Sequence, residues 1–112
     1  MKLNIVSLDT FKISVKKLYK KYRNLLNDLK SLNKILQENP KAGIALGQNC
    51  YKIRLANSSI PTGKSGGFRV IYYYFDNQNN LYLMIIYSKT ELDNISDKKL
   101  NEILQMNKLL IK

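Results

Sequence analysis

The chain has 112 residues, with 45% hydrophobic and 24% charged side chains, a balance typical of one globular domain and not of a disordered chain. No apolar run is long enough for a membrane span, no cleavable leader is evident, and the single cysteine, Cys50, excludes an internal disulfide. Nineteen Lys and Arg against eight Asp and Glu give a net charge of +11. We expect a single basic, cytoplasmic domain over residues 1–112.

The first part of the chain predicts a short strand followed by helices. Apolar residues alternate between Leu3 and Leu8, and Asp9 is expected to cap the helix that follows. Two apolar stripes at helical spacing come next: Phe11, Val15, Leu18 and Tyr22, then Leu25, Leu29, Leu32 and Leu36. They predict either an antiparallel helix pair or one long helix broken near residues 20–23, ending before Pro40.

The second part of the chain predicts strands and a last helix. The strictly alternating segment Cys50–Leu55 predicts one strand. A polar loop spans 56–67, the glycine loop, with turn signals at Pro61, Gly63, Gly66 and Gly67. Residues 68–75 and 81–87 predict two further strands joined by a turn at 76–80. Ser96 is expected to cap a helix whose apolar positions are Leu100, Ile103, Leu104 and Leu110. The order β-α-α-β-β-β-α predicts an α+β fold, a small, mostly antiparallel sheet with its helices on one face.

The positive charge is unevenly distributed along the chain. Between Asn39 and Phe75 there is no acidic residue, while five cations fall inside that stretch: Lys41, Lys52, Arg54, Lys64 and Arg69. A field of this kind attracts phosphate polyanions, so the distribution favours a polyanion site over a merely solvated basic face. An acidic protein partner would suit the same charge.

Several kinds of chemistry lack the residues they need. The sequence has no histidine, its eight acids are scattered, and Cys50 has no ligand partner, so we expect neither a metal site nor a cofactor. The segment Gly63-Lys64-Ser65 is not a P-loop, because Ser58 stands where that motif needs a glycine and a strand follows where it needs a helix. The loop can still present Lys64 and Ser65 to a single phosphate.

One group of residues could carry phosphate chemistry. Lys52 and Arg54 share one side of their strand, and Arg69 shares a side of its own strand with Tyr73. If these strands pair, three cations converge on a sheet face that the helices leave uncovered. Lys64 and Lys89 can reach the same concavity, and Tyr73 and Tyr87 could stack on exposed bases. The plainer alternative is an exposed polar strand face.

Three stretches carry a resemblance to a known family: residues 51–55 (Tyr-Lys-Ile-Arg-Leu), residues 63–73 (Gly-Lys-Ser-Gly-Gly-Phe-Arg-Val-Ile-Tyr-Tyr) and residues 86–91 (Ile-Tyr-Ser-Lys-Thr-Glu). The sequence resembles the RelE/ParE toxin superfamily and looks most like its HigB-like branch. The second stretch is fairly specific, whereas the first is not. The resemblance covers nearly the whole chain, because the order of the predicted elements matches as well.

The resemblance implies a type II toxin–antitoxin toxin that enters the ribosomal A site and cuts mRNA without a metal. The 2′-hydroxyl of the mRNA attacks the adjacent phosphate and leaves a 2′,3′-cyclic phosphate. By position, Lys52 and Arg54 match the family's paired basic residues, and Arg69 matches the arginine that stabilises charge on the phosphate. Lys52 is then the expected general base, because neighbouring like charges disfavour its ammonium form. The implied partners are the ribosome, mRNA and a cognate antitoxin, acidic or part-disordered.

Two positions depart from the family pattern. Thr90 stands where RelE has an arginine, and Ser96 or a neighbour stands where RelE has a tyrosine. The general acid is therefore open, with Lys89 and Tyr87 as the residues that could fill the role. A ParE-like toxin that poisons gyrase is an alternative, although that branch generally lacks the three converging cations. A non-catalytic RNA-binding module with the same basic face is another.

Overall fold

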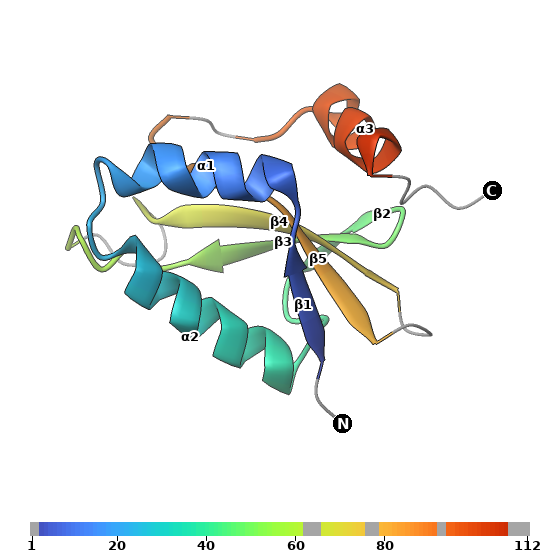
Figure 1. Cartoon of the computed structure of the whole chain (residues 1–112), viewed down its shortest axis with the longest axis horizontal. Helices are drawn as coiled ribbons and strands as arrows, with labels where there is room; N and C mark the ends of the chain where they lie inside the picture. Colours follow the sequence, from blue (N-terminus) through green and yellow to red (C-terminus); the bar gives the residue numbers. More distant parts are fainter. Residues whose placement is uncertain (1–2, 62–65, 76–78, 92–93, 108–112) are drawn as a thin grey trace.

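The computed structural model describes residues 3–61, 66–75, 79–91 and 94–107. Its elements, in chain order, are β1 (Asn4–Ser7), α1 (Asp9–Tyr19), α2 (Leu25–Glu38), β2 (Ile44–Gly47), β3 (Cys50–Leu55), β4 (Phe68–Phe75), β5 (Asn80–Ser88) and α3 (Asp97–Met106). The strands form one sheet in the order β1-β5-β4-β3-β2, in which β1 runs parallel to β5 and the other pairs are antiparallel (Figure 1). The predicted α+β class and mostly antiparallel sheet are confirmed.

The helices α1 and α2 form a pair, not one long helix, and together they cover one face of the sheet (Figure 1). The two predicted stripes supply the buried side chains of this layer: Phe11, Leu18, Tyr22, Leu25, Leu32 and Leu36. Their partners on the sheet are the alternate residues of β3 and β4, from Ile53 and Leu55 to Phe68 and Val70. The prediction of Asp9 as the helix cap is wrong. Leu8 holds the cap position, and Asp9 lies in the first turn, where a carboxylate favours the helix dipole.

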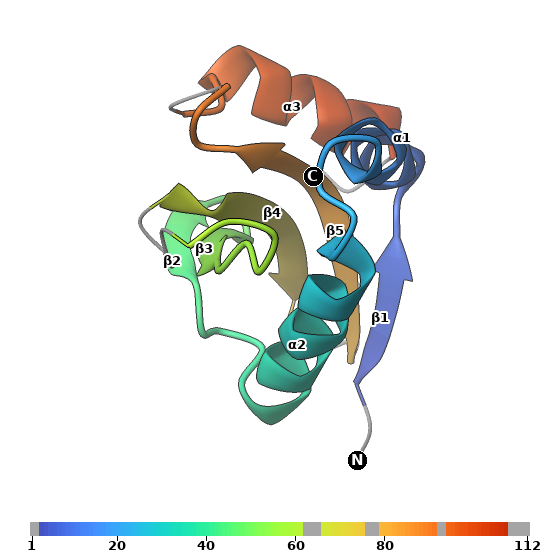
Figure 2. The ribbon, with the colours of Figure 1, turned by 90° about the vertical axis from the view of Figure 1, so that its left-hand side faces the viewer.

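The helix α3 packs against the opposite face of the sheet, so the prediction that all helices lie on one face is wrong (Figure 2). Its buried residues Leu100, Ile103 and Leu104 contact a second apolar cluster that includes Cys50, Ile71, Tyr73, Met84 and Tyr87. Ser96 caps the helix as predicted, its hydroxyl accepting a hydrogen bond from the Lys99 N–H at 3.1 Å. The predicted apolar position Leu110 lies outside the described residues. Helical spacing identifies the buried stripe of α3, but it carries no information on which sheet face the stripe contacts.

The strand β2 is an element that the sequence patterns do not predict. It pairs antiparallel with β3 through a tight turn in which Gln48 and Asn49 have φ values of 54° and 64°. Such left-handed turns match the twist of a hairpin. All four residues of β2 are exposed, so burial imposes no alternation on them. Most of the predicted turn at 76–80 lies outside the described residues. In the described part of the chain, no helix has the length and hydrophobicity of a membrane span.

Candidate functional site

The pairing of β3 with β4 places the predicted cations on one face of the sheet. Arg54 lies directly opposite Arg69 across the two strands, and Lys52 lies opposite Ile71. Residues directly opposite each other point to the same face, and residues two apart on a strand share a face. Lys52, Arg54 and Arg69 therefore project from the same side of the sheet. This is the side that α3 covers in part, so the expectation of a helix-free face holds only at the end of the sheet away from α3.

A bulge in β5 brings Tyr87 to this face as well. Ile71 pairs with Ile85 and Tyr72 pairs with Leu83, so Met84 is an extra residue in the ladder. Without this insertion, simple alternation from Leu83 would point Tyr87 toward α1 and α2. With it, Tyr87 lies opposite Arg69 on the neighbouring strand. An apolar pattern along β5 does not reveal the bulge, because the residues on both faces are apolar.

The cations surround a cavity of about 220 Å³. Its lining residues are Lys52, Arg54, Arg69, Lys89, Ile44 and Asn94, so four positive charges meet there and no carboxylate is among the lining residues that the structure describes. The Lys52 ammonium donates a hydrogen bond to Asn94 Oδ1 at 2.9 Å. We define the candidate site as this cavity. Sequence reasoning missed Asn94 and Ile44, since the first lies in an irregular segment before α3 and the second in the unpredicted β2.

Arg69 is the most buried of these cations, at 4% exposure. Its guanidinium donates to the Phe68 carbonyl oxygen at 3.2 Å. Burial lowers the pKa of Arg69 and the nearby Arg54 charge adds to the effect, yet a guanidinium remains charged at neutral pH. Two arginines directly opposite each other on paired strands repel one another. An anion between them would remove that repulsion, so the arrangement is suited to binding a phosphate.

The end of the glycine loop and Lys89 lie together at the rim of the site. The Lys89 N–H donates to the Gly67 carbonyl oxygen at 3.2 Å. A Cβ at Gly67 would lie 2.3 Å from the Leu55 carbonyl oxygen, so a side chain there would clash with the end of β3. Lys64 and Ser65, the predicted phosphate-binding residues of this loop, lie outside the described residues.

The two tyrosines of the prediction are both buried. Tyr73 is 3% exposed and lies in the cluster under α3, with its ring centroid 6.1 Å from that of Tyr82, so the prediction that its ring stacks on a base does not fit this position. Tyr87 is 6% exposed, and its hydroxyl finds no hydrogen-bond partner among the described residues. Burial raises the pKa of Tyr87, which keeps the hydroxyl protonated at neutral pH. Its ring does not offer a stacking surface either.

The two residues that depart from the family pattern have structural contacts of their own. The Thr90 hydroxyl lies 2.8 Å from the Ser88 hydroxyl, within the turn that carries Lys89. Ser96 is occupied as the cap of α3. Neither residue is among those that line the cavity. In the described part of the chain, no three His, Cys, Asp or Glu side chains are grouped so that they could hold a metal ion.

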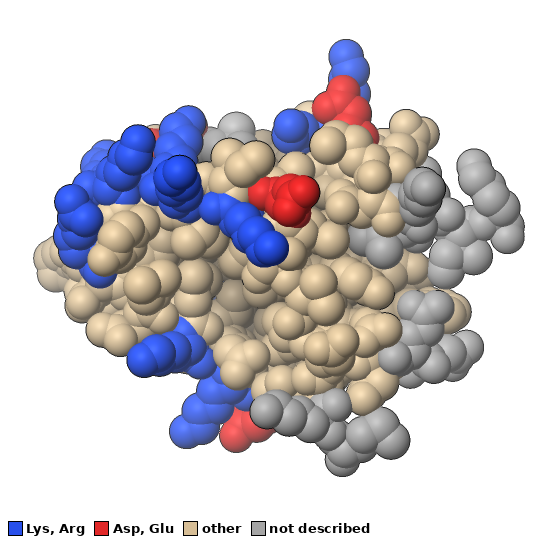
Figure 3. Space-filling view, in the orientation of Figure 1, with Lys and Arg blue, Asp and Glu red and all other residues tan. Residues whose placement is uncertain are grey.

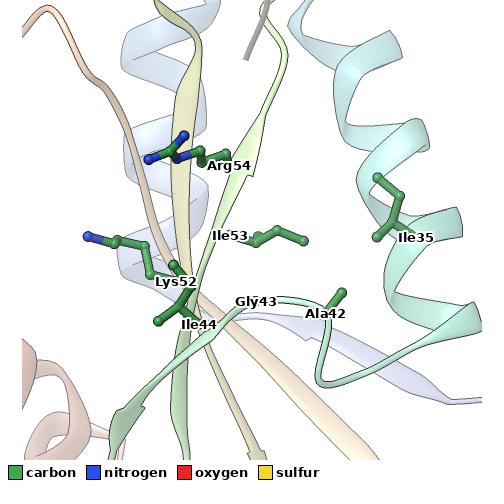
Figure 4. A pocket seen from close by; sticks show the side chains of 7 residues that line it. All are labelled: Ile35, Ala42, Gly43, Ile44, Lys52, Ile53 and Arg54. Carbon is green, nitrogen blue, oxygen red and sulfur yellow. The ribbon is translucent and has the colours of Figure 1, made fainter. Parts of the chain in front are cut away.

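An apolar groove adjoins the site on the other side of Lys52 and Arg54. It has a volume of about 340 Å³ and is lined by Ile35, Ala42, Gly43, Ile44, Lys52, Ile53 and Arg54. Figure 4 shows Lys52 and Arg54 projecting to one side of β3, while Ile53 points to the other side, toward Ile35 of α2. A Cβ at Gly43 would lie 2.8 Å from the Lys52 carbonyl oxygen, so glycine allows this close approach of the two segments.

Comparison with known proteins places the chain in a family. Residues 10–112 match the family model described as the RelE toxin of the RelE / RelB toxin–antitoxin system. The chain therefore belongs to the RelE toxin family, whose members are toxins of type II toxin–antitoxin systems. The resemblance to the RelE/ParE superfamily is confirmed, and the finer placement in a HigB-like branch stays a prediction.

Solved structures from Escherichia coli share the fold. The free toxin RelE, as a mutant lacking two arginines, has 18% sequence identity and a TM-score of 0.60, covering 95% of this chain and 98% of that one. The isolated RelE toxin has 20% identity and a TM-score of 0.54, covering 93% and 98%. A chain of the intact RelBE toxin–antitoxin complex has 24% identity and a TM-score of 0.52, covering 75% and 93%. At identities of 18–24%, these similarities show a shared fold.

Proposed function

We propose that this toxin is a ribosome-dependent endoribonuclease, which cuts mRNA in the ribosomal A site by a metal-free attack of the substrate's own 2′-hydroxyl and so inhibits translation. The observation that carries the proposal is the cavity in which Arg54 and Arg69 face each other beside Lys52 and Lys89. A site that concentrates cations and lacks histidine suits a reaction whose main demand is stabilisation of charge on a phosphate.

In the proposed reaction the 2′-oxygen bonds to the adjacent phosphorus, and the bond from phosphorus to the 5′-oxygen of the next nucleotide breaks. The products are a 2′,3′-cyclic phosphate and a free 5′-hydroxyl. Lys52 acts as the general base for the 2′-hydroxyl, and Arg54 and Arg69 bind the phosphate oxygens as their negative charge grows. Lys89, or the protonated Tyr87 beside Arg69, returns a proton to the leaving 5′-oxygen.

The substrate base beside the cut requires a contact that Tyr73 and Tyr87 do not offer. The groove beside Lys52 and Arg54 is apolar along Ile35, Ile44 and Ile53, and it adjoins the phosphate site directly. We place the base in this groove, and we assign Lys64 and Ser65 of the glycine loop to neighbouring phosphates. The predicted base-stacking role of Tyr73 is not carried into this proposal.

The family membership supports a cognate antitoxin as the protein partner, and the similar E. coli chain occurs in a toxin–antitoxin complex. With a net charge of +11 on this chain, we expect the antitoxin segment that covers the site to be acidic or part-disordered.

The test is cleavage of a defined mRNA on programmed ribosomes, with 5′ ends mapped by primer extension. We expect cuts within the A-site codon, and upstream fragments that end in a 2′,3′-cyclic phosphate. A 2′-deoxy substitution at the nucleotide that supplies the attacking oxygen should abolish the cut. Arg69→Ala should lower the cleavage rate by about 10²- to 10³-fold, the usual effect of removing one group that stabilises transition-state charge.

The controls separate lost chemistry from lost folding. Lys34→Ala, on the exposed side of α2, should cut at the rate of the unchanged protein. Arg69→Lys keeps a positive charge but not the paired donors. If Arg69→Ala is unstable, Arg69→Lys is the variant in which cleavage is compared with that of the unchanged protein. Intact mRNA with ribosomes still bound would overturn the nuclease in favour of an RNA-binding module. Intact mRNA without ribosome binding would overturn both, and a gyrase supercoiling assay would then test the ParE-like alternative.

A further inference from the structure

A second concentration of positive charge lies outside the candidate site, on α1 and the turn that follows it. We call it the α1 basic surface; its members are Lys12, Lys16, Lys17, Lys20, Lys21 and Arg23, and all six are exposed. Between residues 9 and 24 these cations face one acid, Asp9, so this short segment carries +5 of the net +11. Figure 3 shows Lys and Arg gathered over one end of α1 and around that turn.

The neighbouring helix α2 is also a surface helix, but it has no excess of positive charge. Lys30 and Lys34 are exposed there, but Asp28 and Glu38 balance them to a net charge of zero. On α1, by contrast, Lys12, Lys16 and Lys20 are spaced four residues apart, and like charges at that spacing destabilise a helix. The helix dipole accounts for cations in the last turn, such as Lys16 and Lys17, but not for Lys12 in the first half of the helix.

The turn at the end of α1 is also held in place. The Lys21 ammonium lies 5.4 Å from the centre of the Tyr22 ring, and the Arg23 guanidinium lies 5.3 Å from the centre of the Tyr19 ring. Tyr22 itself is 5% exposed and packs edge-on against Phe68, the residue before Arg69, with ring centroids 5.4 Å apart. The backbone that carries the cations of this turn is therefore held in place by the packing of Tyr22 against the core.

The same contacts connect the α1 basic surface to the candidate site. The pKa of Tyr22 is lowered, chiefly through the Ser88 hydroxyl and also through Thr90, so the ring lies beside the two residues that flank Lys89. Lys89 lines the cavity with Arg54 and Arg69. The turn that follows α1 and the segment that carries Lys89 are thus linked through Tyr22.

We infer that the α1 basic surface binds the phosphate backbone of RNA outside the cleaved dinucleotide, independently of sequence, and that it holds the toxin on its RNA target while the cavity performs the cut. This inference rests on the proposed function for its biological setting, but the binding itself can be measured without cleavage. The contacts are those of lysines with phosphates, so the binding should be strongly salt-dependent.

The experiment compares two matched variants. Lys16→Gln/Lys20→Gln removes two lysines four residues apart on α1, and Lys30→Gln/Lys34→Gln removes two exposed lysines at the same spacing on α2. Each lowers the net charge from +11 to +9. Binding of a fluorescent 20-nucleotide RNA, whose 2′-O-methyl groups prevent cleavage, is measured by anisotropy over a range of salt concentrations.

The α1 variant should weaken binding by roughly 25- to 60-fold at about 0.1 M salt, and it should reduce the slope of log affinity against log salt by about 1.4–1.8, the contribution of two phosphate contacts. The α2 variant should change the affinity less than threefold. On ribosomes, the α1 variant should raise the toxin concentration needed for cleavage and leave the maximal rate unchanged.

Equal, small losses in the two variants would overturn the inference, because they would show a response to net charge alone. Unchanged RNA binding with weaker binding of an acidic antitoxin would also overturn it, assigning the α1 basic surface to a protein partner. If the unchanged toxin never cuts mRNA but the α1 variant alone loses RNA affinity, the proposed function fails and the RNA-binding surface stands.

Discussion

The two faces of the sheet use the same strands for different purposes. On one face, α1 and α2 bury a continuous apolar layer that includes Leu25, Leu36 and Phe68. On the other face, α3 buries a smaller apolar cluster at one end, and the four cations of the candidate site occupy the remainder. The first face stabilises the fold. The second face carries like charges that oppose folding, and the apolar layer behind it must offset their repulsion.

Consecutive residues of β4 show the contrast most directly. Phe68 points to the helix pair and is completely buried in hydrocarbon, whereas Arg69 points to the other face, opposite Arg54. A β-strand is suited to this division because its side chains alternate between faces. A change at one residue should therefore affect stability, and a change at the next should affect activity.

Phe68→Ala should have the largest effect on stability. Removing a fully buried phenyl ring costs about 3–5 kcal/mol, and here it also removes the edge-on contact with Tyr22. We expect the urea midpoint to fall sharply, while any molecules that remain folded at low temperature keep the spacing of the cations and hence their cleavage activity. A loss below about 1 kcal/mol would show that the helix-pair face is not the main stabilising layer.

The free energy of unfolding should depend on pH through Cys50, on the α3 side of the sheet. The thiol is 1% exposed, and burial raises its pKa from 9.0 to about 11. Because the raised pKa belongs to the folded state, the associated stability is fully present below about pH 9 and is lost as pH rises from about 9 to 11. A two-unit difference corresponds to about 2–3 kcal/mol of linkage.

The measurement is the free energy of unfolding between pH 8 and 11 for the unchanged protein and for Cys50→Ala. The variant should be less stable at pH 8, because it leaves a small cavity, but its stability should fall less steeply with pH. Tyr72 and Tyr87 also have raised pKa values and titrate in both proteins, so the comparison isolates the thiol. Parallel curves for the two proteins would contradict the assignment.

The contrast between the two faces also explains what the sequence could predict. The stripes of α1 and α2 and the alternation of β3 and β4 identify the helix-pair face, because one buried surface imposes one period on each element. The cations at Lys52, Arg54 and Arg69 follow from the same alternation. These features depend on local spacing, so they can be recognised without knowledge of the fold.

The features that sequence reasoning missed depend on long-range contacts. The face to which α3 packs, the Met84 bulge that turns Tyr87 toward Arg69, and the contact of Asn94 with Lys52 join segments far apart in the chain. The sequence of β2 shows no apolar alternation, because the strand is exposed at the sheet edge. Its one local signal was Gly47-Gln48-Asn49, a sequence suited to a turn with positive φ.

Arg54→Gln should have the smallest effect on stability, and its direction is the informative part. Arg54 is exposed and lies directly opposite Arg69, so removing its charge relieves repulsion across the strand pair. Cross-strand pairs contribute about 0.2–1 kcal/mol, and solvent screening places this one near 0.2–0.5 kcal/mol in favour of the variant. The gain should be present in urea unfolding at low salt and should shrink at about 0.5 M salt.

Arg54→Lys, which keeps the charge, should show no gain. If the variant is more stable yet cuts mRNA more slowly, the repulsion is a stability cost retained for phosphate binding. If it is less stable by more than about 1 kcal/mol, Arg54 serves the fold, and the contrast between the two faces fails at this position.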